Sequence, residues 1–218
     1  MLPLNFSHIP ETGYKLLCLG AHCDDIEIGC GGTLLSLIKN YAINYVKWVV
    51  FASTEERARE AKESARLFLE GVKEKDITVY SFRDGFLSYS GYEIKDEFEK
   101  IKKEFVPDLV FTHYRNDRHQ DHRLISDLSW NTYRDHFILE YEIPKFDGDL
   151  GIPNLFVPID AHLAAQKADI LLKSFTSQAN KHWFDQETFL SLMRIRGMEC
   201  ASATKYAEAF HARKVILS

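Results

Sequence analysis

Two clusters of histidines and carboxylates consist of residue types that bind metals. The first, AHCDDIEIGCGG, places His22 three residues before Asp25. The second, DRHQDHR, places His119 three residues before His122. Residues three apart share one face of a tight turn or of a first helical turn. Each cluster is therefore suited to direct two ligands at one ion.

Two histidines and a carboxylate suit zinc and leave a fourth coordination position for water. Because Asp24 and Asp25 are adjacent, they cannot share a face, so one can bind a metal while the other reaches its water. An Asp-Asp pair after a strand also has an ordinary interpretation as a helix cap. A dinucleotide fingerprint fails on spacing, because His22 stands where its second glycine is needed. Together the two clusters predict a hydrolytic zinc site.

The elements that must position these clusters alternate between strand and helix patterns. Short apolar runs predict strands at Lys15–Gly20, Tyr45–Ala52, Ile77–Phe82 and Asp108–His113. The predicted helices between them are Thr33–Lys39, a helix capped by Ser53 or Thr54, and a helix carrying Ile94, Phe98, Ile101 and Phe105. This order predicts an α/β fold with a Rossmann-like, mostly parallel sheet and helices on both faces. Both clusters follow strand ends, where sites form in such sheets.

The remainder of the chain continues the same pattern. A helix is expected from His122 to about Arg134, strands at Ile138–Ile143 and Asn154–Ile159, helices at Ala161–Phe175 and Gln186–Arg196, and an edge strand or extended arm at Tyr206–Ile216. Lys167 follows helical spacing and is expected to be a surface charge. No repeat, low-complexity tract or change in composition marks a linker, so residues 1–218 are predicted to form a single domain.

Composition excludes several classes of partner. The chain has 32 acidic and 27 basic residues and a net charge of −5, which gives no electrostatic reason to bind nucleic acid or anionic membrane. No apolar run approaches the roughly 18–20 residues of a membrane span. The four cysteines form no C-x-x-C pair and the start of the chain shows no secretory signal. Reduced thiols and a cytoplasmic location are therefore expected.

The two clusters resemble the signature motifs A-H-P-D-D-x-x-x-G and H-x-D-H of the PIG-L/LmbE-like deacetylases, and the element order resembles that family over nearly the whole chain. The resemblance implies an LmbE-like fold and zinc-dependent removal of an acyl group, usually acetyl, from an amino sugar. Matched position by position, it implies the metal ligands His22, Asp25 and His122, the general base Asp24, the carbonyl-polarising His119, its orienting acid Asp121, a substrate-binding Arg57 and a sugar-hydroxyl acceptor Asp84.

Two positions depart from the family pattern, and a further histidine lies near the clusters. Cys23 replaces the usual proline, and its thiol is a further possible ligand although zinc already has three. Asp117 stands where some members have a tyrosine, so no tyrosine hydroxyl is present at that position for an oxyanion contact. His113 ends the fourth predicted strand, where a supporting role behind the ligands is expected.

The sequence thus predicts a zinc-dependent N-deacetylase acting on a small N-acetylated sugar or nucleotide sugar, with Fe2+ or another divalent ion as an alternative metal. In the expected mechanism Asp24 takes a proton from the attacking water, and a protonated His119 stabilises the oxyanion together with zinc. Two alternatives remain open. One is a zinc amidase for a larger sugar–thiol conjugate, and the other is a non-catalytic metal- or sugar-binding domain. The oligomeric state is also open, and includes a homo-oligomer.

Overall fold

The computed structural model describes residues 13–216, which are built around one seven-stranded sheet. The strands are β1 Tyr14–Gly20, β2 Ile43–Ala52, β3 Glu74–Phe82, β4 Leu109–His113, β5 Phe137–Tyr141, β6 Leu155–Ile159 and β7 Tyr206–Ala212. Their order across the sheet is β3-β2-β1-β4-β5-β7-β6. The pairings among β1 to β5 are parallel, and β7 pairs antiparallel with β5 and β6. The predicted mostly parallel α/β sheet is confirmed.

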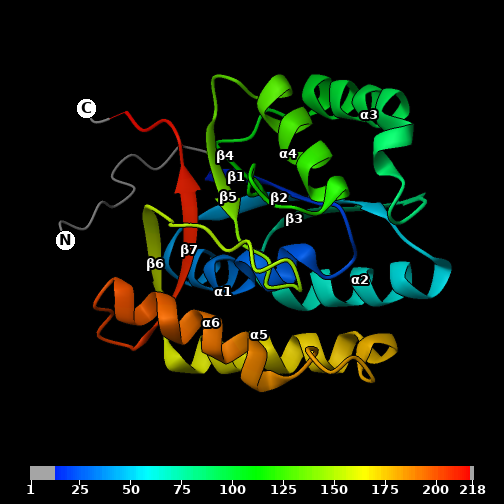
Figure 1. The fold of residues 1–218 in the computed structure, drawn as a ribbon. Coiled ribbons are helices and arrows are strands. Elements are labelled where there is room, and N and C mark those ends of the chain that lie inside the picture. The colour runs from blue at the N-terminus through cyan, green and yellow to red at the C-terminus, as the bar shows by residue number, and fades with distance from the viewer. Residues whose placement is uncertain (1–12, 217–218) are drawn as a thin grey trace.

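Helices cover both faces of this sheet. They are α1 Asp25–Asn40, α2 Glu55–Phe68, α3 Gly91–Glu104, α4 Gln120–Thr132, α5 Ala161–Ser174 and α6 Gln186–Glu199, with short 3-10 turns at Leu87–Ser90 and Thr176–Gln178. Figure 1 shows α3 and α4 on one face, α1 and α2 on the other, and α5 and α6 as a further layer beyond α1 and α2. None of the helices within residues 13–216 is both long and apolar enough to cross a bilayer.

The central strands are apolar along their whole length because both of their faces are covered. Successive strand residues point to opposite faces. On β1, Leu16 and Cys18 belong to the apolar core on the α1 side, whereas Leu17 and Leu19 belong to the core under α3 and α4. All four are essentially inaccessible to solvent. This double burial explains why the strands appear in the sequence as continuous apolar runs.

The structure differs from prediction at α1, which begins at Asp25 rather than at Thr33. The glycine cluster therefore lies inside a helix, although glycine disfavours helix interiors. Tertiary packing supplies the reason. A Cβ atom on Gly29 would lie 2.2 Å from Cδ2 of Tyr141, so only glycine lets α1 approach the sheet this closely.

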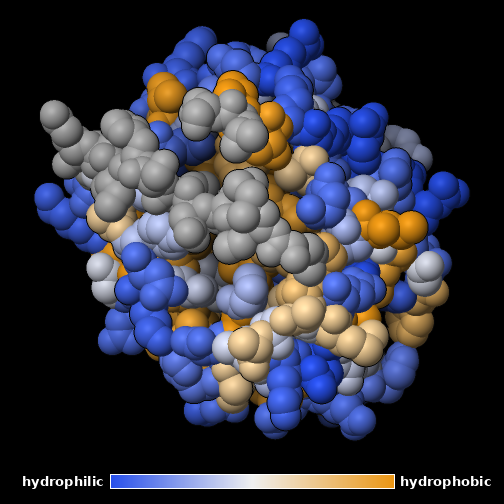
Figure 2. Space-filling view, turned by 90° about the vertical axis from the view of Figure 1, so that its left-hand side faces the viewer, coloured by the Kyte–Doolittle hydropathy of each residue, from blue (hydrophilic) through white to orange (hydrophobic). Residues whose placement is uncertain are grey.

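The C-terminal region also differs from prediction, because β7 lies between β5 and β6 rather than at an edge. β6 is the edge strand, and Leu155, Phe156 and Val157 on it remain partly exposed. Figure 2 views the molecule from the left-hand side of Figure 1, the side of β6 and β7, and shows hydrophobic surface among hydrophilic residues. The edge position of β6 accounts for partly covered apolar side chains on this side.

Lys167 is buried, so its expected place on the surface is wrong. Its Nζ donates to Oε1 of Glu208 and to the Ile28 carbonyl, both at 2.6 Å. Glu208 on β7 also accepts hydrogen bonds from the backbone of Gly32 and Thr33, at 2.8 and 2.6 Å. A buried charge needs such pairing and hydrogen bonding. The pair thereby ties α5 and β7 to the middle of α1.

Candidate metal centre

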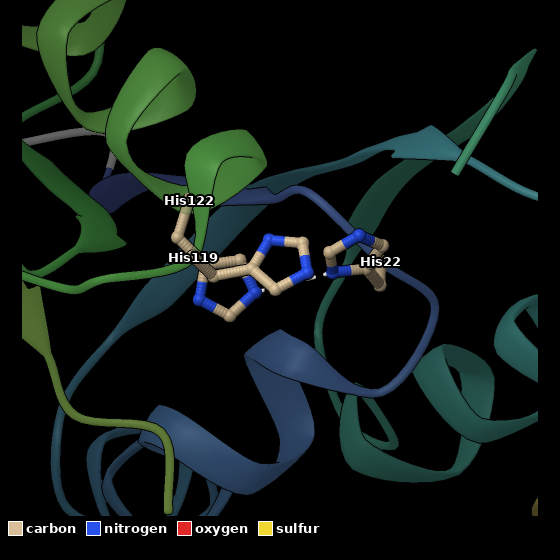
Figure 3. Close-up of side chains that lie close together, drawn as sticks. All are labelled: His22, His119 and His122. Carbon is tan, nitrogen blue, oxygen red and sulfur yellow. Dashed lines mark hydrogen bonds between the residues drawn. The ribbon is translucent and has the colours of Figure 1, made fainter. Parts of the chain in front are cut away.

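The carboxyl ends of β1 and β4 bring the two ligand clusters together. His22 lies in the short turn after β1, and Asp25 is the first residue of α1. His119 caps the amino end of α4, and His122 lies in its first turn. Figure 3 shows the imidazoles of His22, His119 and His122 converging, and each offers a nitrogen within 4.8 Å of the others. Two clusters almost one hundred residues apart in sequence thus form one site.

The three expected metal ligands lie in mutual contact. Nδ1 of His22 is 3.1 Å from Nε2 of His122 and 3.3 Å from Oδ2 of Asp25. Oδ1 of Asp25 lies 3.5 Å from Nε2 of His122. One nitrogen from each histidine and a carboxylate therefore share a single small volume.

The outer nitrogens of the same histidines face other carboxylates. Nδ1 of His122 is 2.9 Å from Oδ2 of Asp117, and Nε2 of His22 is 3.3 Å from Asp121 and 3.1 Å from Asp84. Because ionised carboxylates only accept hydrogen bonds, the outer nitrogens carry the protons and the inner nitrogens of neutral rings present lone pairs. In the metal-free protein a proton is shared between these two inner nitrogens across 3.1 Å. Loss of that proton would leave two lone pairs and a carboxylate, which together can bind a cation. The residues present therefore fit a divalent metal ion.

The pKa values of His22 and Asp25 also show that the cluster favours positive charge. Burial alone would lower the pKa of His22, but the charge of Asp25 and hydrogen bonds to Asp121, Asp25 and Asp84 raise that pKa well above its ordinary value. Burial would raise the pKa of Asp25, but neighbouring histidines, first His122, then His113 and His22, hold it well below the usual range. The cluster is therefore built to stabilise a cation.

Asp24, the expected base, makes an ion pair with Arg57. Nη2 of Arg57 is 2.9 Å from Oδ2 of Asp24, and Nη1 is 3.3 Å from Glu60 and 3.4 Å from the Ser177 hydroxyl. The guanidinium also lies over the Phe175 ring, 5.0 Å from its centre. Of the predicted Ser53 and Thr54 caps, the structure uses Thr54, whose side chain accepts from the Arg57 backbone at 3.3 Å. Arg57 is thus fixed at both its backbone and its side chain.

Asp121 contacts His119 differently from the expected orienting acid. Its carboxylate accepts from the backbone of Gly85 and Leu87 at 2.7 and 3.1 Å, and only its backbone N–H reaches Nδ1 of His119, at 3.3 Å. Burial, followed by the nearby His122 and His22, lowers the pKa of His119. The lowered pKa favours the uncharged ring, whereas the sequence predicts a protonated one. Because Nδ1 accepts a hydrogen bond, the remaining proton is on Nε2.

His113 and Lys145 complete the surroundings of the ligands. The ring of His113 stacks on His122 with 3.9 Å between centres, and its Nε2 lies 3.1 Å from Asp25 and 2.9 Å from the Ala21 backbone N–H. Burial, and then the proximity of His122, lower its pKa to about 4. Lys145 donates to Oδ2 of Asp117 at 2.9 Å. Sequence reasoning placed His113 near the site but missed Lys145, because a lone lysine in a loop carries no motif.

Cys23 is separate from the ligand group. Its thiol donates to the Ala52 carbonyl at 3.5 Å, and burial raises its pKa to about 12. A neutral thiol is a poor metal ligand. Within residues 13–216, Cys23 belongs to none of the side-chain groups with metal-binding geometry.

Comparison with known proteins identifies the family of this chain. Residues 17–133 match the family model described as PIG-L: GlcNAc-PI de-N-acetylase. The chain is 30% identical over 137 residues to the uncharacterized deacetylase YaiS of Escherichia coli K12, covering 60% of this chain and 74% of YaiS.

Two solved structures illustrate the similarity of fold. The N,N'-diacetylchitobiose deacetylase of Pyrococcus horikoshii is 25% identical, with a TM-score of 0.69 over 91% of this chain and 83% of that protein. The 4-carboxy-2-hydroxymuconate hydratase GalB of Pseudomonas putida KT2440 is 15% identical, with a TM-score of 0.71 over 94% and 98% of the two chains, and shares the fold alone. From the match over residues 17–133 and the similarity to YaiS, this chain belongs to the PIG-L family of deacetylases.

Proposed function

We propose that this chain is a zinc-dependent hydrolase that removes an N-acetyl group from an amino sugar or sugar conjugate. The observation that carries the proposal is the contact of His22 Nδ1, His122 Nε2 and the Asp25 carboxylate, with the Asp24 carboxylate beside them in sequence. Membership of a deacetylase family supports the reaction type. The similarity to a protein named for N,N'-diacetylchitobiose supports an N-acetylated sugar.

In this proposal His22, Asp25 and His122 hold the metal. Two imidazoles and one carboxylate are the ligand types of catalytic zinc sites, and Fe2+ or another divalent ion is the alternative. When bound, zinc supplies Lewis acidity, which polarises the acyl oxygen and lowers the pKa of water toward neutrality. Asp121 and Asp117 keep protons on the outer nitrogens of His22 and His122, which leaves the inner nitrogens free to bind.

The remaining side chains act on protons and on substrate. Asp24 accepts the proton of the attacking water, and its ion pair with Arg57 orients the carboxylate. His119 donates from Nε2 to the acyl oxygen as negative charge develops there. Asp84 has a side chain that is 77% exposed, and we assign it to a sugar hydroxyl. We assign Arg57, which pairs with Asp24, to substrate binding.

The direct test is metal content together with acetate release. Purified protein should contain about one zinc per chain and should release acetate from members of a panel of N-acetylated sugars, chito-oligosaccharides and nucleotide sugars. Chelation should abolish the release and added zinc should restore it. His122→Ala should lose the metal, whereas the matched control His162→Ala, at an exposed position on α5, should keep it. Full zinc occupancy in His122→Ala would remove His122 from the ligand set.

The same assay separates the rival functions. The fold alone does not specify a reaction, since GalB is a hydratase with the same architecture. Acetate release only from sugar–thiol conjugates in the panel would identify the amidase alternative. A zinc-loaded protein that binds sugars but releases no acetate would be a binding domain. The position of Asp24 beside the ligands argues against that outcome, because binding alone needs no base.

A further inference from the structure

The carboxylate of Asp117 accepts three hydrogen bonds at the centre of the loop between β4 and α4. Its Oδ1 accepts from the backbone N–H of His119 at 2.8 Å. Its Oδ2 accepts from Nδ1 of His122 at 2.9 Å and from Nζ of Lys145 at 2.9 Å. The residue is only 3% exposed. Both carboxylate oxygens are therefore committed to fixed partners, two of which lie in the histidine cluster.

The bond to His122 selects one form of its ring. A carboxylate held by a lysine accepts hydrogen bonds, so Nδ1 of His122 must carry the proton. The lone pair of the neutral ring is then on Nε2, the atom 3.1 Å from Nδ1 of His22 and 3.5 Å from Asp25. The opposite tautomer would point an N–H into the space proposed for the metal. Asp117 thus determines whether His122 can act as a ligand.

Asp117 is itself held by the loop that connects β5 to β6. Lys145 in this loop also donates to Oδ1 of Asp149 at 2.6 Å, and Oδ2 of Asp149 accepts from the Arg118 backbone at 2.6 Å. Gly148 has a φ of +60°, a conformation that glycine adopts readily, and forms the turn between Lys145 and Asp149. The loop is therefore bonded both to Asp117 and to the residue after it, Arg118.

We propose that Asp117 is a positioning residue that fixes the metal-binding tautomer of His122, and that Lys145 and Asp149 anchor it from the β5–β6 loop. The inference rests on the proposed metal site and adds determinants of metal affinity beyond the proposed ligands. Lys145 and Asp149 lie outside both clusters. Asp117 thus has a different role from the tyrosine that some family members have at this position.

The first test needs no metal and no substrate. In ¹⁵N-labelled, metal-free protein at neutral pH, long-range ¹⁵N–¹H correlation spectra distinguish the two histidine tautomers. His122, assigned by its loss from the spectrum of His122→Ala, should carry its proton on Nδ1. In Asp117→Ala it should shift toward the Nε2-protonated form. A predominantly Nε2-protonated His122 in the wild-type protein would overturn the proposal.

The second test is metal affinity by competition with a chromophoric chelator, using zinc and cobalt. Asp117→Asn should weaken binding by about 10- to 100-fold, the usual effect of removing a carboxylate behind a ligating histidine, and should alter the visible cobalt spectrum. Lys145→Met should weaken binding in the same direction but less. The effects of the two changes should be less than additive, because both act through Oδ2 of Asp117. Asp147→Asn, in the same loop with an exposed side chain, is the matched control.

The outcomes separate this inference from the proposed function. Wild-type affinity in both Asp117→Asn and Lys145→Met, combined with loss of metal in His122→Ala, would reject the positioning role alone. Wild-type affinity in all three variants would reject the proposed ligand set as well. If Asp117→Asn fails to fold, Lys145→Met still tests the proposal, because the proposal requires the metal affinity of Lys145→Met to fall.

Discussion

Arg57 and Asp24 form an ion pair, with 2.9 Å between Nη2 of the arginine and Oδ2 of the carboxylate. The two side chains are only 16% and 10% exposed. The residue expected to bind substrate therefore contacts the residue proposed as the base. Any change at Arg57 should affect the reaction step as well as substrate binding.

The first prediction follows from this pair. Arg57→Lys should lower kcat as well as raise KM. The branched guanidinium contacts Asp24, Glu60 and Ser177 at once, which a single ammonium group cannot do. We expect kcat/KM to fall by about tenfold or more, equivalent to about 1.4 kcal/mol of transition-state stabilisation. Steady-state kinetics measure this, with the exposed Arg66→Lys of the same helix as control. A change in KM alone would mean that Arg57 has no part in orienting Asp24.

The adjacent carboxylates should have separable roles. Asp24→Asn should keep the metal and lose roughly 10²- to 10⁴-fold in kcat, as expected for a positioned general base. Asp25→Asn should lower metal affinity instead, because Asp25 contacts both His22 and His122. Metal analysis and kinetics on both variants check this. If the two phenotypes were exchanged, the assignments of base and ligand would be reversed.

His119 should act as a neutral hydrogen-bond donor. His119→Ala should lower kcat by about 10²-fold or more with little effect on KM, since the bond forms mainly to the developing oxyanion. His119→Gln, which retains an N–H donor, should recover part of the rate. Because the pKa of His119 is lowered, its neutral form persists as pH rises through neutrality. An alkaline decline in activity should therefore stay at the same pH in His119→Ala. Its disappearance would show that His119 acts in its charged form.

His113 should make the metal-free protein acid-sensitive. Its pKa is about 4 in the folded protein, against about 6.5 in an unfolded chain. Between these values the unfolded chain binds a proton that the folded protein does not, so stability is full above the upper value and falls as pH falls toward the lower one. The loss attributable to His113 is of order 3 kcal/mol. Denaturant unfolding in chelator between pH 7.5 and 4.5 measures it.

The control compares the replacement of a buried histidine with the replacement of an exposed one. His113→Gln keeps an acceptor for the Ala21 N–H but cannot become charged, so it should show a flatter pH dependence than the wild type. His162→Gln, at an exposed site, should follow the wild-type curve. Parallel curves for wild type and His113→Gln would contradict the assignment.

Gly29 should not tolerate even a methyl group. A Cβ atom there would lie 2.2 Å from the ring of Tyr141, which is fixed by a 2.7 Å hydrogen bond from its hydroxyl to the Leu19 carbonyl. Gly29→Ala should therefore destabilise the protein by about 1–3 kcal/mol or more through overpacking. Gly91→Ala is the control, since the nearest atom to its added Cβ is 3.8 Å away. Thermal unfolding compares the two, and equal melting temperatures would contradict the packing argument.

The first four strands and the two ligand clusters were predictable because local pattern and tertiary role agree there. β1 and β4 are buried along nearly their whole length, and His22 and His122 follow their carboxyl ends, where sites form in open parallel sheets. The start of α1 was not predictable, because the packing of Gly29 against Tyr141 overrides a poor helix propensity.

Contacts between distant segments were the other part that the sequence could not supply. Lys167 has the helical spacing of a surface residue, and only its burial against Glu208 shows otherwise. The pair of Arg57 with Asp24 and the contact of Lys145 with Asp117 likewise join segments with no shared motif. Such pairs depend on how helices and loops pack on the sheet, which no single-segment pattern encodes.

The placement of β7 between β5 and β6 has a consequence for the nascent chain. When residues 1–199 have left the ribosome, β5 is paired with β4 but still lacks β7, and the N–H groups of Gly32 and Thr33 still lack the Glu208 carboxylate. The helix that begins with Asp25 is thus completed only after residues 206–212 are synthesised. Ribosome-bound intermediates should accordingly contain the helix that begins with Asp25 without its final support, and the proposed metal site should be completed late in translation.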